Sequence, residues 1–144
     1  MEGSDTEHRP APPMDGLAGQ YFAWHLDREL RLQRCDECRT WIHPPQHWCG
    51  SCGSGVLSWE PASGHGTVFT WAVTHRPFHS AFADEAPYIC VIVTLDEGPR
   101  VFTMLREISE DAVVDGLEVS VEFEPRENDS LVAIFVPTDR KVTI

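Results

Sequence analysis

Two Cys-x-x-Cys pairs restrict what this chain can fold into more than any other feature. Cys35 and Cys38 form the first pair, and Cys49 and Cys52 form the second after ten intervening residues. A tetrahedral zinc site needs four ligands that converge from two turns, and thiolates are ligands that Zn²⁺ prefers. The pattern therefore predicts a small zinc ribbon. Because protein ligands fill all four positions, we expect the metal to hold structure and to perform no Lewis-acid catalysis.

Other uses of the four cysteines fit less well. Two disulfides require an oxidising compartment, which nothing in the sequence indicates. A redox-active dithiol normally lies on a thioredoxin-like βαβ unit, and no such unit is predicted. Tetrahedral thiolate sites also accept iron, so a rubredoxin-like electron carrier stays open as a function class. His43 and His47 lie between the two pairs, but four cysteines already complete the site.

Alternating apolar residues predict a mainly β chain beyond residue 60. A helical turn is expected between the third and fourth strands of this part, with Ser109 as its N-cap and Gly116 at its end. This order matches the small five-stranded barrel called the OB-fold. The expected strands are 66–75, 88–95, 100–105, 117–124 and 130–136.

The chain before the barrel divides into a tail and a helix that leads into the ribbon. The first residues are rich in proline and poor in apolar side chains, a composition typical of disorder. Leu17, Tyr21 and Trp24 then follow at helical spacing, and a short strand from Leu30 enters the first cysteine turn. The expected parts are a disordered tail at 1–16, the helix and zinc ribbon at 17–60, the barrel at 61–137 and a C-terminal tail at 138–144.

The acidic balance of the chain argues against several classes of partner. Among its 144 residues, 23 are acidic and 11 basic, which gives a formal charge of −12. Nucleic-acid affinity comes largely from lysine and arginine that neutralise phosphates, so we expect no nucleic-acid partner. Single-stranded nucleic-acid binding stays the alternative function, because ribbons and OB-folds both have that use. No apolar run reaches the ~18 residues that cross a membrane, and no signal peptide is recognised, so a cytoplasmic location is expected.

Motifs that carry catalysis are missing from the sequence. It contains no G-x-S-x-G, P-loop, G-x-G-x-x-G or H-E-x-x-H pattern, and no catalytic residue is assigned. The loop after the first barrel strand carries His75, Arg76 and His79, which suit a phosphate or carboxylate ligand where OB-folds bind ligands. Cys90 stands in an apolar run and is expected to be a buried free thiol.

An ordered series of short motifs between about residues 17 and 137 resembles the DUF35 family. In order, the series is LRLQRC-x-x-C, Pro44-Pro45, C-x-x-CG, Trp59, SGHGTV, Pro87-Tyr88 and LDEGPR. The resemblance implies an N-terminal helix, a rubredoxin-like zinc ribbon that carries the four cysteines, and an OB-fold barrel. DUF35 proteins are associated with acyl-CoA chemistry.

The resemblance also implies a partner. DUF35 proteins look like subunits of complexes with thiolase-fold enzymes, which include thiolases, acetyltransferases and retro-aldolases that shorten steroid side chains. A hetero-oligomer is therefore expected, in which this chain helps to bind or channel the acyl-CoA thioester while the partner carries the catalytic residues.

Two sets of side chains near the ribbon are candidates for these contacts. CoA is a polyanion, and an arginine-dense stretch with Arg28, Arg31, Arg34 and Arg39 is the expected place for its phosphates. Aromatic residues are enriched in the cores of protein interfaces. The expected aromatic contacts with the partner are Tyr21, Phe22, Trp24, Trp41 and Trp48.

Overall fold

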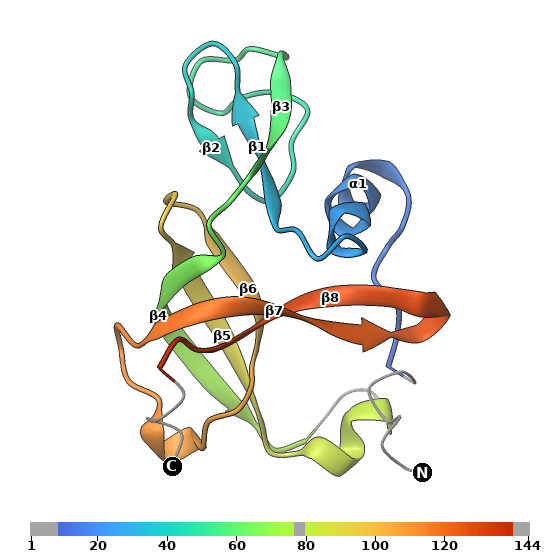
Figure 1. The fold of residues 1–144 in the computed structure, drawn as a ribbon, viewed down its shortest axis with the longest axis vertical. Helices are drawn as coiled ribbons and strands as arrows, with labels where there is room; N and C mark the ends of the chain where they lie inside the picture. Colours follow the sequence, from blue (N-terminus) through green and yellow to red (C-terminus); the bar gives the residue numbers. More distant parts are fainter. Residues whose placement is uncertain (1–8, 77–79, 140–144) are drawn as a thin grey trace.

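The computed structural model describes residues 9–76 and 80–139. Within these ranges the chain is mainly β: helix α1 (Gly16–His25) precedes a three-stranded ribbon and a closed five-stranded barrel. The ribbon stands on one end of the barrel, and α1 lies beside the joint between the two (Figure 1). The predicted architecture of helix, ribbon and OB barrel is confirmed.

The ribbon is an antiparallel sheet in the order β2-β1-β3. Its strands are β1 (Arg31–Cys35), β2 (Trp41–Ile42) and β3 (Leu57–Pro61). β1 is central, since Gln33 pairs with Ile42 on one side and with Trp59 on the other. Leu32 belongs to the main hydrophobic core, whereas Cys35 is buried in a second, smaller cluster. One short strand thus connects the main core to the cysteine site.

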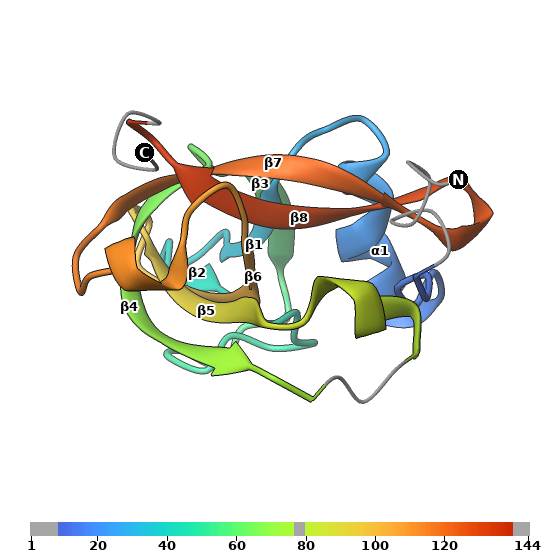
Figure 2. The ribbon, with the colours of Figure 1, turned by 90° about the horizontal axis from the view of Figure 1, so that it is seen from below.

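The barrel closes in the order β4-β5-β6-β8-β7. Its strands are β4 (His65–Thr74), β5 (Tyr88–Leu95), β6 (Arg100–Leu105), β7 (Glu118–Arg126) and β8 (Ser130–Pro137). β4 pairs with β7 to close the ring, and β6 pairs with β8 in parallel. Seen along the barrel, β7 and β8 lie across from β4 and β5 (Figure 2). These five strands correspond to the five predicted from the sequence: β5 and β6 agree at both ends, and the ends of the other three differ by at most two residues.

Side chains that alternate along the strands fill the barrel. In β5 every second residue is buried, from Ile89 to Leu95. Val91, Val93 and Phe135 are at most 1% exposed, and burial of such side chains contributes roughly 1.5–3 kcal/mol each. Tyr21 of α1 joins this core, which attaches the helix to the barrel.

The segment before α1 corrects one prediction. A disordered tail was expected through residue 16, but Arg9 is fully buried. Its carbonyl accepts a hydrogen bond from the Glu127 backbone N–H at 3.0 Å, and its side chain pairs with Glu85 and Glu124. Charged partners that are distant in the sequence hold this segment in place. The prediction of disorder used the low apolar content of the segment, which gives no information about such partners. The predicted disorder of residues 1–8 lies outside the described residues.

Smaller corrections concern helix ends and one thiol. The helical turn after β6 is a 3-10 turn, η3 (Glu110–Ala112), and Ser109 makes no side-chain cap hydrogen bond. Cys90 is half-buried on β5 and not fully buried, with its sulfur 3.6 Å from the Thr74 hydroxyl. Of the predicted C-terminal tail, Thr138 and Asp139 are described, and the Thr138 N–H donates to the Glu118 carbonyl.

Two further 3-10 turns complete the described part. They are η2 (Ser80–Glu85), before β5, and η4 (Glu127–Asp129), between β7 and β8. Across residues 9–76 and 80–139, no helix combines the length and apolar character needed to cross a bilayer.

Candidate metal centre and ligand cavities

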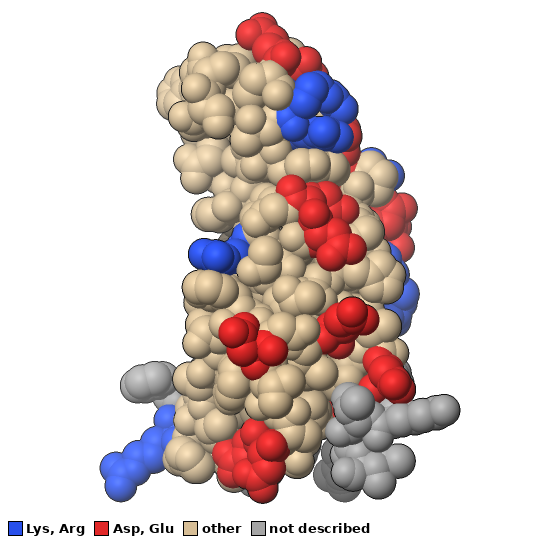
Figure 3. Space-filling model, turned by 90° about the vertical axis from the view of Figure 1, so that its left-hand side faces the viewer, with Lys and Arg blue, Asp and Glu red and all other residues tan. Residues whose placement is uncertain are grey.

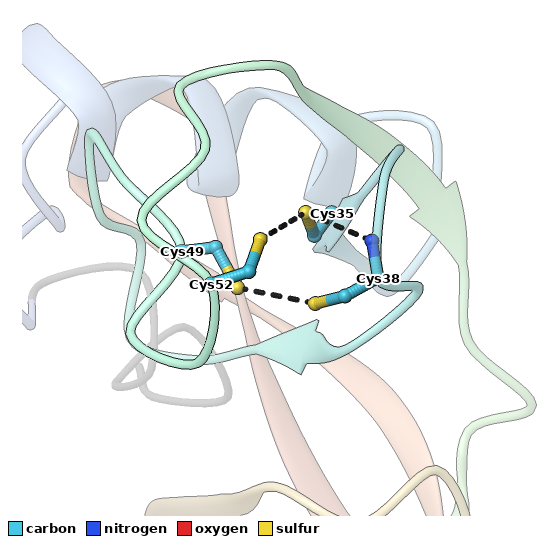
Figure 4. A group of neighbouring side chains, drawn as sticks. All are labelled: Cys35, Cys38, Cys49 and Cys52. Atoms are coloured by element: carbon cyan, nitrogen blue, oxygen red, sulfur yellow. Dashed lines mark hydrogen bonds between the residues drawn. The ribbon is translucent and has the colours of Figure 1, made fainter.

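The ribbon brings the four predicted cysteines together. Their sulfur atoms all lie within 4.8 Å of one another. The sulfurs of Cys35 and Cys52 are 3.6 Å apart, and those of Cys38 and Cys49 are 3.5 Å apart. Figure 4 shows the four side chains pointing into one space from two turns. All four cysteines are free thiols, so the disulfide alternative is not what the structure contains.

Backbone amides in both turns point at the sulfurs. The Cys38 N–H donates to Cys35 Sγ and the Ser51 N–H donates to Cys49 Sγ, each at 3.4 Å. The Cys38 backbone lowers the pKa of Cys35, and the Cys52 and Ser51 backbones lower the pKa of Cys49 to about 6. Because the thiolate is the form that binds metal, these turns favour the ligand form of both sulfurs.

The donor set fits zinc. With Zn–S bonds of about 2.3 Å, a tetrahedral site places its sulfurs roughly 3.8 Å apart, close to the two shortest separations here. His43 and His47 are not part of the cluster. Cys35 and Cys49 are buried, whereas Cys38 and Cys52 are exposed. The cluster therefore lies at the surface of the ribbon and has all four protein ligands of a structural site.

Intramolecular ion pairs occupy two of the arginines expected to contact CoA. Glu60 binds both: its carboxylate oxygens lie 3.5 Å from Arg34 Nη1 and 3.1 Å from Arg39 Nη2. Arg34 also donates to the Arg39 carbonyl at 2.8 Å and stacks over the Trp41 ring at 4.5 Å. These contacts join β1, the first cysteine turn and β3.

Arg31 is held differently. Its Nε lies 2.6 Å from the Glu29 carboxylate, and its guanidinium stacks over Trp24 at 4.5 Å. Its two terminal nitrogens make no hydrogen bond or ion pair within the described residues. Arg31 lines a cavity of about 330 Å³ at the joint between ribbon and barrel.

The predicted ligand loop after β4 is described in part. His75 and Arg76 lie in a bend directly after β4, and both are exposed. His79 falls outside the described residues. A ligand role for this loop stays a prediction.

The expected aromatic patch is divided between core and surface. Tyr21 is only 6% exposed and packs against His25 and His43, so the exposure expected of it was wrong. Phe22, Trp24 and Trp41 are half-buried. Trp48, in the loop between β2 and β3, is 66% exposed.

Two exposed aromatic residues of the barrel were missed by the sequence analysis. Phe102 of β6 is 71% exposed and Phe69 of β4 is 47% exposed. Phe102 lies next to the buried Val101, and alternation along a strand then turns it outward. Alternation applied to the predicted strand at residues 100–105 identifies Phe102 as outward-facing from the sequence alone.

An apolar cavity of about 260 Å³ lies between α1, the ribbon and the barrel. Tyr21 and His25 come from the helix, His43 and Pro44 from the ribbon, and Phe102 from β6. Burial lowers the pKa of His25 and of His43 to about 4, so both rings are neutral at pH 7. The cavity therefore suits an apolar group.

A network of charges ties the N-terminal segment to the barrel. Two carboxylates, Glu85 and Glu124, bind three arginines: Arg9, Arg106 and Arg126. Burial opposes ionisation of Glu124, but the hydrogen bonds and charges of Arg106 and Arg126 hold the pKa of Glu124 below its usual value. Each cation in this network already has a carboxylate partner.

The face drawn in Figure 3 offers little to a polyanion. On the face drawn in Figure 3, acidic side chains are spread from the ribbon to the far end of the barrel, and basic ones are few and separated. Proteins that bind single-stranded nucleic acid without sequence preference use a continuous positive groove. This face does not provide one.

Comparisons with known proteins identify both parts of the chain. Residues 23–58 match the family model of the ChsH2 rubredoxin-like zinc ribbon domain, and residues 59–124 match that of the ChsH2 C-terminal OB-fold domain. A DUF35 domain-containing scaffold protein of Pyrococcus furiosus is 32% identical over 99 residues, which cover 67% of this chain and 71% of that one.

Two longer relatives are named as hydratase subunits. The probable enoyl-CoA hydratase alpha subunit of Thermomonospora curvata is 34% identical over 129 residues, 90% of this chain but 40% of its own length. The 3-oxo-4,17-pregnadiene-20-carboxyl-CoA hydratase alpha subunit of Mycobacterium tuberculosis is 29% identical over 121 residues, 83% of this chain and 37% of its own. This chain thus spans about two fifths of these relatives.

Solved structures agree with the family models. A chain of the "Ltp2-ChsH2(DUF35) aldolase" superposes with a TM-score of 0.79 and 35% identity, over 90% of this chain and 98% of that one. A DUF35 protein of unknown function from Sulfolobus solfataricus, 10% identical, shares the fold with a TM-score of 0.56 over 73% and 76% of the two chains. The chain belongs to the DUF35 family, with a ChsH2-type zinc ribbon and OB-fold domain.

Proposed function

We propose that this chain is a non-catalytic subunit that binds a thiolase-fold enzyme and helps it to hold or channel an acyl-CoA substrate. The observation that carries the proposal is the superposition on the ChsH2(DUF35) chain of an aldolase complex, which covers 98% of that chain at 35% identity. A match of this extent supports a shared role as the small subunit. The name "scaffold protein" of the shorter relatives agrees with such a role.

The metal has a structural part in this proposal. Cys35, Cys38, Cys49 and Cys52 hold one Zn²⁺, which fixes the two turns that a ribbon this small cannot fix by a hydrophobic core. The buried part of the ribbon core consists of two of these cysteines and Ile42. Zinc therefore determines whether the ribbon presents an ordered surface.

The exposed aromatic side chains supply candidate contacts with the enzyme. Trp48 lies in the ribbon and Phe102 on the barrel, and both are more than 60% exposed. Large aromatic side chains in the centre of an interface commonly contribute 2 kcal/mol or more to binding. Tyr21, which is buried, acts instead by attaching α1 to the core.

The substrate part of the proposal rests on the apolar cavity beside α1. The cavity of about 260 Å³ is lined by aromatic and aliphatic side chains together with two neutral histidines. Such a lining suits the acyl part of a thioester. The hydratase names of the longer relatives belong to chains of which this one spans about two fifths, so hydratase activity forms no part of the proposal.

The enzyme contact is tested with a Trp48→Ala variant. We expect the zinc-loaded variant to bind the thiolase-fold partner at least tenfold more weakly than wild type, because an exposed tryptophan in the interface is lost. Val114→Ala, a matched truncation of another exposed apolar residue (54% exposed), serves as the control. Equal affinity of Trp48→Ala and wild type would remove Trp48 from the interface. No binding of any thiolase-fold enzyme by wild type would contradict the proposal itself.

A further inference from the structure

Of the nine arginines in the described residues, five are bound to carboxylates through their terminal nitrogens. Among the other four, Arg76 lies in the exposed bend after β4, and Arg100 donates its Nε to the Thr94 hydroxyl and stacks over Phe69. The Arg28 side chain makes no hydrogen bond or ion pair within the described residues, and Arg31 uses its Nε for Glu29 while its terminal nitrogens bind no other side chain there. The arginines bound to carboxylates through their terminal nitrogens are Arg9, Arg34, Arg39, Arg106 and Arg126.

Arg28 and Arg31 line the same cavity of about 330 Å³. It lies where the chain passes from α1 to β1 and from β3 to β4, so Ser63, Gly64 and Val121 form its other side. Its volume is within the range of small-molecule sites. The one carboxylate in its lining is Glu29, which leaves the cavity with a local charge of +1 in a chain of −12.

The backbone at Arg28 is unusual for an arginine. Its φ is 58°, in the left-handed region that favours glycine. Two hydrogen bonds at the end of α1 impose this conformation: the Arg28 N–H donates to the His25 carbonyl at 2.8 Å, and the Glu29 N–H donates to the Trp24 carbonyl at 3.1 Å. Glycine or asparagine normally occupies this position after a helix. A strained residue that the surrounding structure holds in place is a reason to look for function.

Arg31 is oriented before any ligand arrives. Glu29 fixes its Nε at 2.6 Å, and the Trp24 ring supports the flat face of the guanidinium at 4.5 Å. The terminal Nη1 and Nη2 groups stay available as a fork of N–H donors. This fork matches the oxygen atoms of a phosphate group in a bidentate arrangement.

We propose that the cavity between Arg28 and Arg31 binds a phosphate group of the CoA moiety. This inference rests on the proposed function, since it assigns a place to the ligand that the function requires. It also narrows the expected set of CoA contacts to Arg28 and Arg31, because Arg34 and Arg39 hold the ribbon through Glu60. A phosphate at the joint would lie against the connection from α1 to β1 and the connection from β3 to β4.

The test is a calorimetric titration of the zinc-loaded chain with CoA, 3′-dephospho-CoA and inorganic phosphate. The decisive variant is Arg28→Gly, because glycine accepts a φ of 58° without strain. We expect this variant to be at least as stable as wild type, with a melting temperature higher by roughly 2 °C. Its CoA affinity should fall about tenfold or more, the effect of losing a hydrogen bond to a charged group. Arg39→Gln, which removes the same charge from the ribbon, should bind CoA like wild type.

Each outcome of these titrations tests a different part of the proposal. Equal CoA affinity for wild type and Arg28→Gly would overturn the phosphate site and leave the proposed function standing. Inorganic phosphate that binds as tightly as CoA would make this a general phosphate site and overturn its assignment to CoA. If Arg28→Gly weakens CoA and 3′-dephospho-CoA equally, the site is supported and the group bound is the pyrophosphate. No CoA binding by wild type, alone or with its co-purified partner, would contradict the proposed acyl-CoA function and this site together.

Discussion

Replacement of His25 by methionine should remove part of the acid sensitivity of this protein. The His25 side chain is fully buried, with Tyr21, Phe22 and Phe123 around its ring. Neither ring nitrogen makes a hydrogen bond of normal geometry within the described residues. Burial lowers the pKa of His25 to about 4, although the Leu131 backbone partly opposes the shift. The folded state therefore holds this ring neutral.

The sign of the pH effect follows from the two pKa values. The unfolded chain protonates His25 near pH 6.5, and the folded chain does so near pH 4. Between these values the unfolded state binds more protons than the folded state. The free energy of unfolding therefore has its full value above about pH 6.5 and decreases as the pH falls toward 4. At about 1.4 kcal/mol per pH unit, the full loss is roughly 3 kcal/mol, of which about 2 kcal/mol appears at pH 5.

The measurement is the free energy of unfolding in urea at several pH values between 7 and 5, for zinc-loaded wild type and His25→Met. We expect the variant to lose about 2 kcal/mol less than wild type between pH 7 and pH 5. At pH 7 it should be about as stable as wild type, since methionine fills irregular apolar space and the ring had no hydrogen bond to lose. Acid release of the metal affects both proteins, so it cancels in the difference.

The control is His75→Met, which replaces an exposed histidine in the bend after β4. The pH profiles of the two variants then separate burial from the mere loss of a histidine. If His25→Met lost as much stability between pH 7 and pH 5 as wild type does, the argument from burial would be refuted.

Two further predictions concern the metal and the N-terminal segment. Cys49→Ser should release the metal and unfold the ribbon while most of the β signal of the barrel persists in circular dichroism, and one full equivalent of zinc in the purified variant would refute the four-cysteine site. Arg9→Ala leaves two partly buried carboxylates with one cation fewer, so its unfolding free energy should fall by about 3 kcal/mol. Arg76→Ala, at an exposed position, should cost under about 0.5 kcal/mol, and an equal loss in both variants would contradict the burial of Arg9.

Most of the fold could be predicted from local patterns in the sequence. The apolar run at residues 88–95 predicted β5 with both ends correct, although the barrel buries only every second residue of this strand. The spacing of the four cysteines is also a local pattern, and it predicted the ribbon. The helical spacing of Leu17, Tyr21 and Trp24 likewise predicted α1, which ends at His25 before Arg28 adopts the left-handed conformation.

The errors concern what a local pattern cannot report. Helical spacing marked Tyr21 and Trp24 as one stripe, but spacing does not tell whether a stripe faces its own barrel or a partner, and Tyr21 is in the core. Arg9 was assigned to a disordered tail because its neighbours are polar and proline-rich. Its partner Glu124 lies 115 residues away along the chain, so nothing local predicts the pair.

The arginines near the ribbon show the same limit at the candidate site. The sequence located an arginine-dense stretch, but it could not tell which of its members are already neutralised. Glu60, on β3, binds both Arg34 and Arg39, and only the register of β3 against β1 brings it there. Arg28 and Arg31 make no ion pair with Glu60 and line the cavity at the joint between ribbon and barrel.

The proposed function makes this chain the small subunit of a thiolase-fold enzyme. It is tested by affinity purification of the tagged chain from its native cell, with mass spectrometry of the retained proteins. We expect recovery of a thiolase-fold enzyme in near-stoichiometric amount. Recovery of the chain alone, or with nucleic acid in place of an enzyme, would contradict it.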